Sequence, residues 1–130
     1  MIGASDSVLG DRFLYCEGDA SLLFTENENN TERLVGVPNR TPFVKDGINN
    51  YIVHDRRDAV NPEKTGTKAA IHYSLTVGGG ESKVVRLRLN DATPAASVPT
   101  RNESASKFGE EFENVMESCR REAEIGRAHV

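Results

Sequence analysis

The sequence predicts a mainly β fold that ends in one amphipathic helix. Apolar and polar side chains alternate over residues 69–77 and again over 83–89, and two shorter β-rich runs precede them at 12–16 and 21–25. Alternation with a period of two is typical of strands that bury one face. Over residues 105–123 the apolar spacing follows the helical repeat instead.

The two long alternating runs predict an antiparallel hairpin. Ile71 and Tyr73 share one face of the first run, and Leu87 and Leu89 share one face of the second. The glycine-rich residues 78–82 between the runs suit a turn. We therefore expect the two runs to pair with each other and to bury one face against further strands, because a lone hairpin is only marginally stable.

The two shorter runs predict a second hairpin. Gly18 and Asp19 lie between residues 12–16 and 21–25, and both residue types are common in tight turns. The next segment, residues 26–68, is rich in amides, prolines and turn formers, and within it only residues 51–53 have strand character. We expect an ordered, irregular loop here, because scattered aromatic and aliphatic residues argue against disorder.

The C-terminal part predicts a linker at 92–104 and a connecting helix at 105–123, which Ser104 or Ser106 could cap. Six apolar residues form the stripe of this helix: Phe108, Phe112, Val115, Met116, Cys119 and Ala123. Cys16 lies in a β-rich run, and we interpret both cysteines as small buried hydrophobes rather than as a disulfide.

Residues 124–130 break the helical spacing and resemble the translation of a sequencing adapter. We interpret them as a probable adapter scar and exclude them from the fold. The natural protein is therefore expected to continue beyond about Ala123, and His129 is given no role. An ordinary frayed terminus is the alternative.

Composition limits the possible classes of function. The net charge of −4 and the absence of a basic stripe argue against a nucleic-acid partner. No apolar run approaches the ~20 residues of a membrane helix, and residues 1–10 lack a signal-peptide pattern, so we expect no membrane partner and favour a cytoplasmic location. Apolar residues make up only 37% of the chain, which suggests that part of its core is supplied elsewhere.

No residue pattern predicts catalysis. His54, His72 and His129 lack metal-ligand spacing, neither cysteine has a partner at C-x-x-C distance, and the three glycines at 78–80 lie in a turn rather than before a helix. The carboxylates at Glu26, Glu28 and Glu32 are better explained as a solvated loop than as a glycosidase pair. We therefore expect no catalytic residue, no metal and no cofactor in this chain.

The most informative local pattern lies between Asn39 and Tyr51, where charges, amides, aromatic residues and glycine are interleaved. This composition suits a loop that packs on another domain, the interpretation we favour. Direct contact with a sugar cleft is the alternative. Seven residues are the candidates for either role: Asn39, Arg40, Phe43, Lys45, Asp46, Asn49 and Tyr51.

Residues 12–91 also resemble a known family. The stretches 15–18, 23–34 and 36–51, continued at 59–62 and 65–70, are similar to glycoside hydrolase family 63, and more closely to the large bacterial-type proteins related to mannosyl-oligosaccharide glucosidase. The resemblance implies an N-terminal antiparallel β-sandwich that packs against an (α/α)6 barrel. In that family the barrel carries both catalytic carboxylates and hydrolyses α-glucosides with inversion.

On this resemblance, residues 1–91 would be part of the sandwich, and the helix at 105–123 would lead to a barrel that is missing from this chain. The chain alone would be inert, although its parent would be a glycosidase acting on oligosaccharides. Its partner would be the barrel of the same full-length protein. The alternative is a free-standing β-rich module that binds a glycan or a protein, and such a module should fold by itself.

Overall fold

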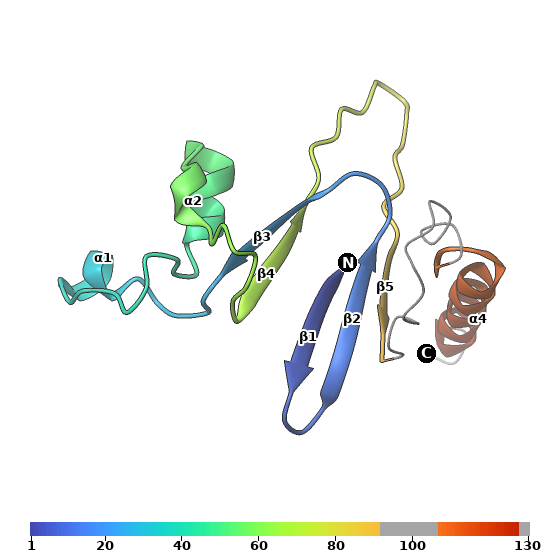
Figure 1. The fold of residues 1–130 in the computed structure, drawn as a ribbon. Coiled ribbons are helices and arrows are strands. Elements are labelled where there is room, and N and C mark those ends of the chain that lie inside the picture. Colours follow the sequence, from blue (N-terminus) through green and yellow to red (C-terminus); the bar gives the residue numbers. More distant parts are fainter. Residues whose placement is uncertain (92–106, 128–130) are drawn as a thin grey trace. The chain divides into compact units, whose positions relative to one another are not determined.

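The computed structural model describes residues 1–91 and 107–127, which form two compact units (Figure 1). Unit 1 consists of Met1–Gly18 and Ser82–Val130, and unit 2 consists of Asp19–Glu81. Along the chain, the polypeptide leaves unit 1 after Gly18 and returns to it at Ser82. The predicted linker at 92–104, Ser104 and Ser106 lie outside the described residues.

Unit 1 contains an antiparallel sheet with the order β1-β2-β5. Its strands are β1 (Ile2–Asp6), β2 (Gly10–Cys16) and β5 (Leu87–Asn90). Leu14 lies opposite Ile2 of β1 and Leu89 of β5, so these three side chains share one face of the sheet.

The sequence did not predict β1, because its Gly, Ala, Ser and Asp residues are disfavoured in strands. The partner strand compensates for this composition. Gly3 lies opposite Phe13, and the Phe13 ring occupies the space beside the glycine. Tertiary pairing therefore overrides the weak local preference.

The β1–β2 turn depends on the carboxylate of Asp6. Asp6 Oδ1 accepts hydrogen bonds from the backbone nitrogens of Leu9 and Val8, each at 2.8 Å. These two bonds lower the pKa of Asp6 below its usual 3.8.

We expect the turn to loosen only under acidic conditions. A folded-state pKa below the usual value means that the contribution of Asp6 is complete above pH 3.8 and is lost as the pH falls through the folded-state pKa. A pH titration followed by the NMR shifts of the Val8 and Leu9 amides measures this. Asp6→Asn is the control, and shifts that still titrate in that variant would contradict the assignment.

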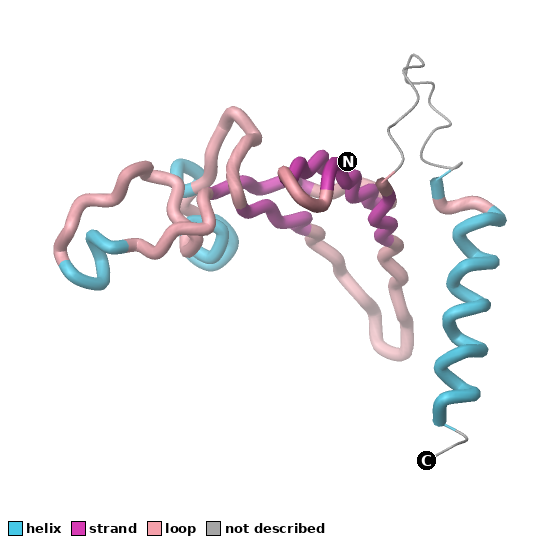
Figure 2. The backbone as a smooth tube through the Cα atoms, turned by 90° about the horizontal axis from the view of Figure 1, so that it is seen from below, coloured by secondary structure: helices cyan, strands magenta, loops and turns pink. Residues whose placement is uncertain are grey.

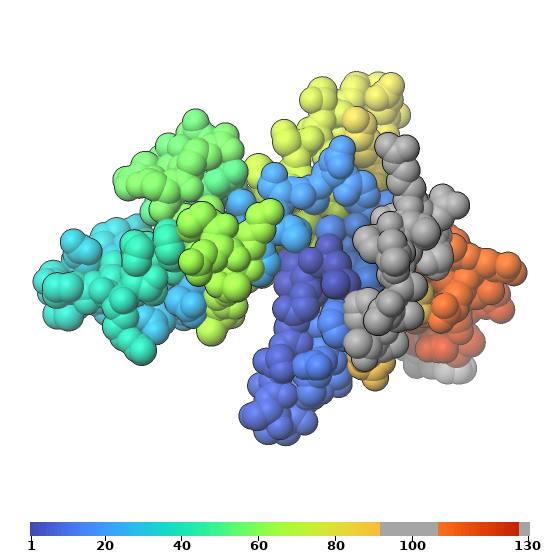
Figure 3. Space-filling model, viewed as in Figure 1, coloured from blue at the N-terminus to red at the C-terminus, as the bar shows by residue number. Residues whose placement is uncertain are grey.

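Both predicted hairpins are wrong, although the strand positions are largely right. Unit 2 pairs β3 (Ser21–Thr25) with β4 (Lys68–His72), whereas β2 pairs with β5. Alternation shows which residues share a face but does not identify the partner strand. Residues 74–85 are exposed throughout and contain no strand, and Figure 3 shows this yellow segment at the surface. The chain does turn at the glycines, where the backbone nitrogen of Glu81 donates to the oxygen of Gly78.

The two faces of the unit 1 sheet have opposite character. Tyr15 and Arg88 share one face, on which Lys107 Nζ lies 5.1 Å from the centre of the Tyr15 ring. Arg88 donates to the backbone oxygen of Lys107 and pairs with Glu111 at 2.9 Å. The other face carries Leu87 and Leu89, which are 47% and 66% exposed. The expectation that these leucines are buried within this chain is therefore wrong. Ile2 of β1 lies on the same face but is buried, so the open part of this face is its β5 side.

The C-terminal helix α4 spans Glu110–Arg127 and is continuous in Figure 2. It begins and ends later than predicted, because Phe108 and Gly109 interrupt the helical conformation after Lys107 and residues 124–127 extend the helix. Phe108 is buried and meets Phe112 edge-on at 5.2 Å.

The rest of the predicted apolar stripe is uncovered. Val115 and Met116 are exposed, and so is Cys119, which contradicts the expectation that this cysteine is buried. Cys16 is half-buried, and both cysteines are free thiols. The stripe therefore offers an apolar surface that unit 1 leaves largely open.

Unit 2 consists of the β3–β4 pair and three short helical elements, which are joined by loops in Figure 2. The helical elements are α1 (Thr31–Val35), α2 (Gly47–His54) and the 3-10 helix η1 (Arg57–Ala59). Buried side chains come from Leu23 and Thr25 of β3 and from Val44. The predicted long loop is therefore ordered but partly helical.

The strand character assigned to residues 51–53 is wrong, because these residues lie in α2. Tyr, Ile and Val favour strands, but Asp46 precedes the helix at its N-cap position and Asp55 ends it in the left-handed conformation. Tyr51 meets the ring of His72 edge-on at 6.5 Å, which packs α2 beside β4. Packing thus decides the conformation of this segment.

Two glycines allow the backbone segments of unit 2 to approach closely. A Cβ atom at Gly47 would overlap the carbonyl oxygen of Ala59, and one at Gly66 would overlap the carbonyl oxygen of Thr25. Only glycine fits such approaches without movement of the backbone. These two positions therefore fix η1 against α2 and the 66–67 segment against β3.

Within the described part of the chain, no helix is long and apolar enough to cross a membrane.

Candidate functional site

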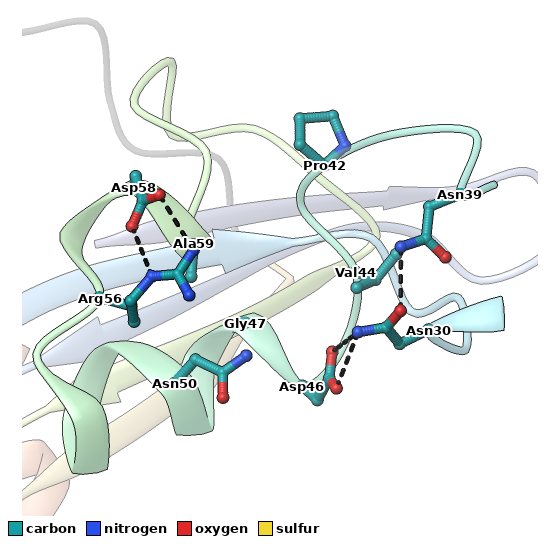
Figure 4. A pocket seen from close by; sticks show the side chains of 10 residues that line it. All are labelled: Asn30, Asn39, Pro42, Val44, Asp46, Gly47, Asn50, Arg56, Asp58 and Ala59. Carbon is teal, nitrogen blue, oxygen red and sulfur yellow. Dashed lines mark hydrogen bonds and ion pairs between the residues drawn. The ribbon is translucent and has the colours of Figure 1, made fainter. Parts of the chain in front are cut away.

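A polar pocket of about 240 Å³ lies in unit 2 (Figure 4). The chain forms it by bringing together the Asn30–Asn39 region, the start of α2, and η1. Val44, Gly47 and Ala59 supply apolar surface, and Pro42 lies at the edge in Figure 4. The remaining lining residues are polar, and all of them except Asn50 belong to two hydrogen-bonded walls.

The first wall is built on Asn30 and Asp46. The amide nitrogen of Asn30 lies 3.4 and 3.2 Å from the two carboxylate oxygens of Asp46. Arg33 Nη1 donates to Asp46 Oδ2 at 3.2 Å and neutralises its charge. Asn30 Oδ1 also caps α1 by accepting from the backbone nitrogen of Arg33. This wall is therefore rigid and without net charge.

Asn39 extends the first wall. Its amide nitrogen donates to Asn30 Oδ1 at 3.0 Å, and its own oxygen accepts from Thr31 Oγ1 at 3.1 Å and from the backbone nitrogen of Glu32 at 3.3 Å. Three bonds hold this side chain in one orientation.

The second wall is the pair of Arg56 and Asp58. Arg56 Nε and Nη2 each donate to one oxygen of Asp58 at 3.2 Å, a bidentate arrangement. The hydrogen bonds to Arg56 lower the pKa of Asp58, and the same bonds raise the pKa of Arg56. Both groups therefore stay charged over the physiological pH range, and their charges cancel.

Asn50 lies between the two walls, where Figure 4 shows its amide between Arg56 and Asp46. The side chain comes from the second turn of α2 and is half-buried. Among the described residues, no hydrogen bond is made by this amide.

Of the seven candidate residues, the structure brings Asn39 and Asp46 to the pocket and leaves the others outside it. Arg40 pairs with Glu28 at 3.3 Å, and Lys45 and Asn49 are exposed. Phe43 is half-buried, and its backbone oxygen accepts from the nitrogen of Glu26 at 2.7 Å. The loop is therefore divided between a pocket side and a solvent side.

Tyr51 lies at a second, more open hollow of about 480 Å³ beside β3 and residues 60–64. The guanidinium of Arg57 stacks on its ring at 4.7 Å and donates to its hydroxyl at 2.7 Å. Arg57 also pairs with Asp55. The hydrogen bond to Asp55 raises the pKa of Arg57 most, and the hydrogen bond to the Tyr51 hydroxyl raises it further. The ring and the hydroxyl of Tyr51 thus already contact Arg57 within unit 2.

Sequence reasoning missed Asn30, Asn50, Arg56 and Asp58. Asn30 had a usable signal, since an asparagine immediately before a helix often caps it. The others had none, because the residues of α2 and η1 were assigned to an irregular loop with strand character only at residues 51–53. Across residues 1–91 and 107–127, no group of three His, Cys, Asp or Glu side chains could hold a metal ion.

Comparison with curated proteins finds one relative. The chain is 33% identical over 108 residues to Uncharacterized protein YMR196W of Saccharomyces cerevisiae, which is a match to 82% of this chain but only 10% of the yeast protein. The chain thus spans about a tenth of the length of this relative. No protein-family model matches the chain. No solved structure matches it.

Proposed function

We propose that this chain is part of the N-terminal β-sandwich of a large glycosidase similar to glycoside hydrolase family 63. The parent protein would hydrolyse α-glucosidic bonds of oligosaccharides with a catalytic barrel that lies outside this chain. The enzymatic part of the proposal rests on the resemblance of residues 12–91 to that family. The similarity to a yeast protein of which the match covers only 10% agrees with a large parent.

One structural observation carries the architectural part of the proposal, namely the open apolar face of the unit 1 sheet. Leu14, Leu87 and Leu89 share this face, and Leu89 is the most exposed of them. A β-sandwich buries such a face against a second sheet about 10 Å away. The proposal therefore assigns a second sheet of the parent protein to this face.

The barrel is assigned to the outer side of α4 and to the exposed side of the 39–51 loop. Val115 and Met116 supply apolar contacts on α4, and Arg40, Lys45 and Asn49 supply polar contacts on the loop. Apolar and polar contacts both occur at such interfaces, and the two surfaces belong to different units and are assigned separately. This assignment keeps domain packing as the role of the solvent-facing loop residues.

The open face gives a test of the architecture. We expect Leu89→Ala to lower the unfolding free energy of the full-length protein by about 2 kcal/mol, since it would remove a buried leucine side chain. In the 130-residue chain the same change should alter stability by less than ~0.5 kcal/mol, because the side chain is exposed. Urea denaturation of both proteins measures the difference, and an equal effect in the two would contradict a second sheet.

The activity is tested on the protein that is encoded by the complete gene. Full-length protein should release glucose from α-linked glucose disaccharides, and NMR should detect the β-anomer first if the configuration is inverted. The 130-residue chain should release none. A gene that starts at Met1 and stops after Val130 would overturn the proposal and would favour a free-standing binding module.

A further inference from the structure

The charges that surround the unit 2 pocket are balanced in pairs. Asp46 is neutralised by Arg33, and Asp58 is neutralised by Arg56. A ligand with a full positive or negative charge would have to compete with these internal partners. The pocket therefore favours a ligand without net charge.

Several hydrogen-bonding groups nevertheless remain available. The Asn50 amide offers a carbonyl oxygen and two N–H donors, none of which is engaged by the described residues. Asn39 uses one of its two N–H donors, for Asn30, and Arg56 uses Nε and Nη2 for Asp58, which leaves Nη1. Donors and acceptors thus face the same space from three sides, with Asn50 between the walls (Figure 4).

We infer that this pocket binds a neutral polyhydroxyl ring, such as one pyranose unit of a glycan. Each hydroxyl of a sugar both donates and accepts, which matches side-chain amides better than it matches either an anion or an alkyl chain. The small apolar surface from Val44 and Pro42 suits the C–H groups of such a ring. The site consists of unit 2 residues alone, so it does not depend on the glycosidase proposal.

The amides that hold the site are positioned before any ligand arrives. Asn39 makes three hydrogen bonds and Arg56 makes two, whereas the Asn50 amide makes none with the described residues and can turn to meet a ligand. Prior positioning reduces the entropy that binding costs. Asn50 is therefore the residue whose loss should weaken binding without disturbing the walls.

NMR titration of the 130-residue chain with methyl α-D-glucopyranoside tests the inference. The amide shifts of Asn39, Asp46 and Asn50 should move together and saturate. Asn50→Ala should weaken binding about three- to tenfold, the loss expected for one net hydrogen bond. Asn27→Ala, at an exposed asparagine of the same unit that does not line the pocket, should leave the affinity unchanged.

Three results would overturn the inference: no saturable shift at these residues, unchanged binding in Asn50→Ala, or displacement of the sugar by inorganic phosphate. Alanine is a better helix former than asparagine, so Asn50→Ala should retain α2. If the sugar binds but the full-length protein is inactive on glucosides, the pocket stands and the glycosidase proposal fails. If the full-length protein hydrolyses glucosides but this pocket binds no sugar, only the inference about the pocket fails.

Discussion

Replacing Gly47 with alanine is expected to unfold unit 2 or to destabilise it severely. The added Cβ would overlap the carbonyl oxygen of Ala59 and would lie 3.3 Å from Thr25 Cγ2. Neither neighbouring atom can move aside easily, because the oxygen of Ala59 belongs to the backbone and the side chain of Thr25 is fully buried. Overpacking that forces the backbone to shift costs about 1–3 kcal/mol and occasionally more, and overlap with a backbone oxygen places this change at the upper end. Loss of protection against hydrogen exchange at the amides of β3 and β4 measures the effect.

Gly79→Ala is the matched control for this change. Gly79 belongs to the same unit, and a Cβ atom there would meet nothing within 4 Å. This variant should retain the exchange protection of β3 and β4, because the added methyl group would point into solvent. If Gly79→Ala lost as much protection as Gly47→Ala, the packing of α2 on η1 would not be the cause.

Leu23→Ala is expected to cost about 2–5 kcal/mol, the range for a buried leucine replaced by alanine. Leu23 is 3% exposed and lies at the centre of β3, opposite Ala70 of β4. Small domains have only about 0.05–0.15 kcal/mol of stability per residue. The loss is therefore comparable to the whole stability of unit 2, and urea denaturation that is followed by β3 and β4 amide signals should show it.

Leu34→Ala provides the comparison within the same unit, because Leu34 of α1 is exposed. An exposed substitution of the same type should change the free energy of unfolding by less than ~0.5 kcal/mol. Equal losses in the two variants would show that Leu23 does not lie in a packed core.

The sequence located most strands but could not assign their partners. Residues 12–16 and 21–25 lie in strands, as their β-rich composition predicted, and residues 87–89 lie in a strand, as the alternation predicted. The turn residues at Gly18 and Gly78–Gly80 suggested local hairpins, whereas the β2–β5 and β3–β4 ladders join segments far apart in the chain. Residues that alternate in polarity specify a face, and the contacts that choose the partner strand are non-local.

The candidate site was predictable only where its residues lie close together in the sequence. Composition identified Asn39 and Asp46, which lie close together in sequence and in a polar loop. Asn50, Arg56 and Asp58 reach the pocket only because residues 47–54 form a helix, which turns Asn50 toward η1. The β-favouring residues Tyr51 to Val53 concealed that helix from local reasoning.

The insertion of unit 2 between β2 and β5 has a consequence for the order of folding. The β2–β5 ladder, continued by the bond from the nitrogen of Glu17 to the oxygen of Arg86, can form only when the chain from Gly18 to Arg86 has been closed into a loop. Closing a long flexible loop carries an entropic cost that grows with its length. When unit 2 has already become compact, the loop that must be closed is effectively shorter. The local β1–β2 pair should therefore form early, and β5 should join the sheet only after the inserted segment has become compact.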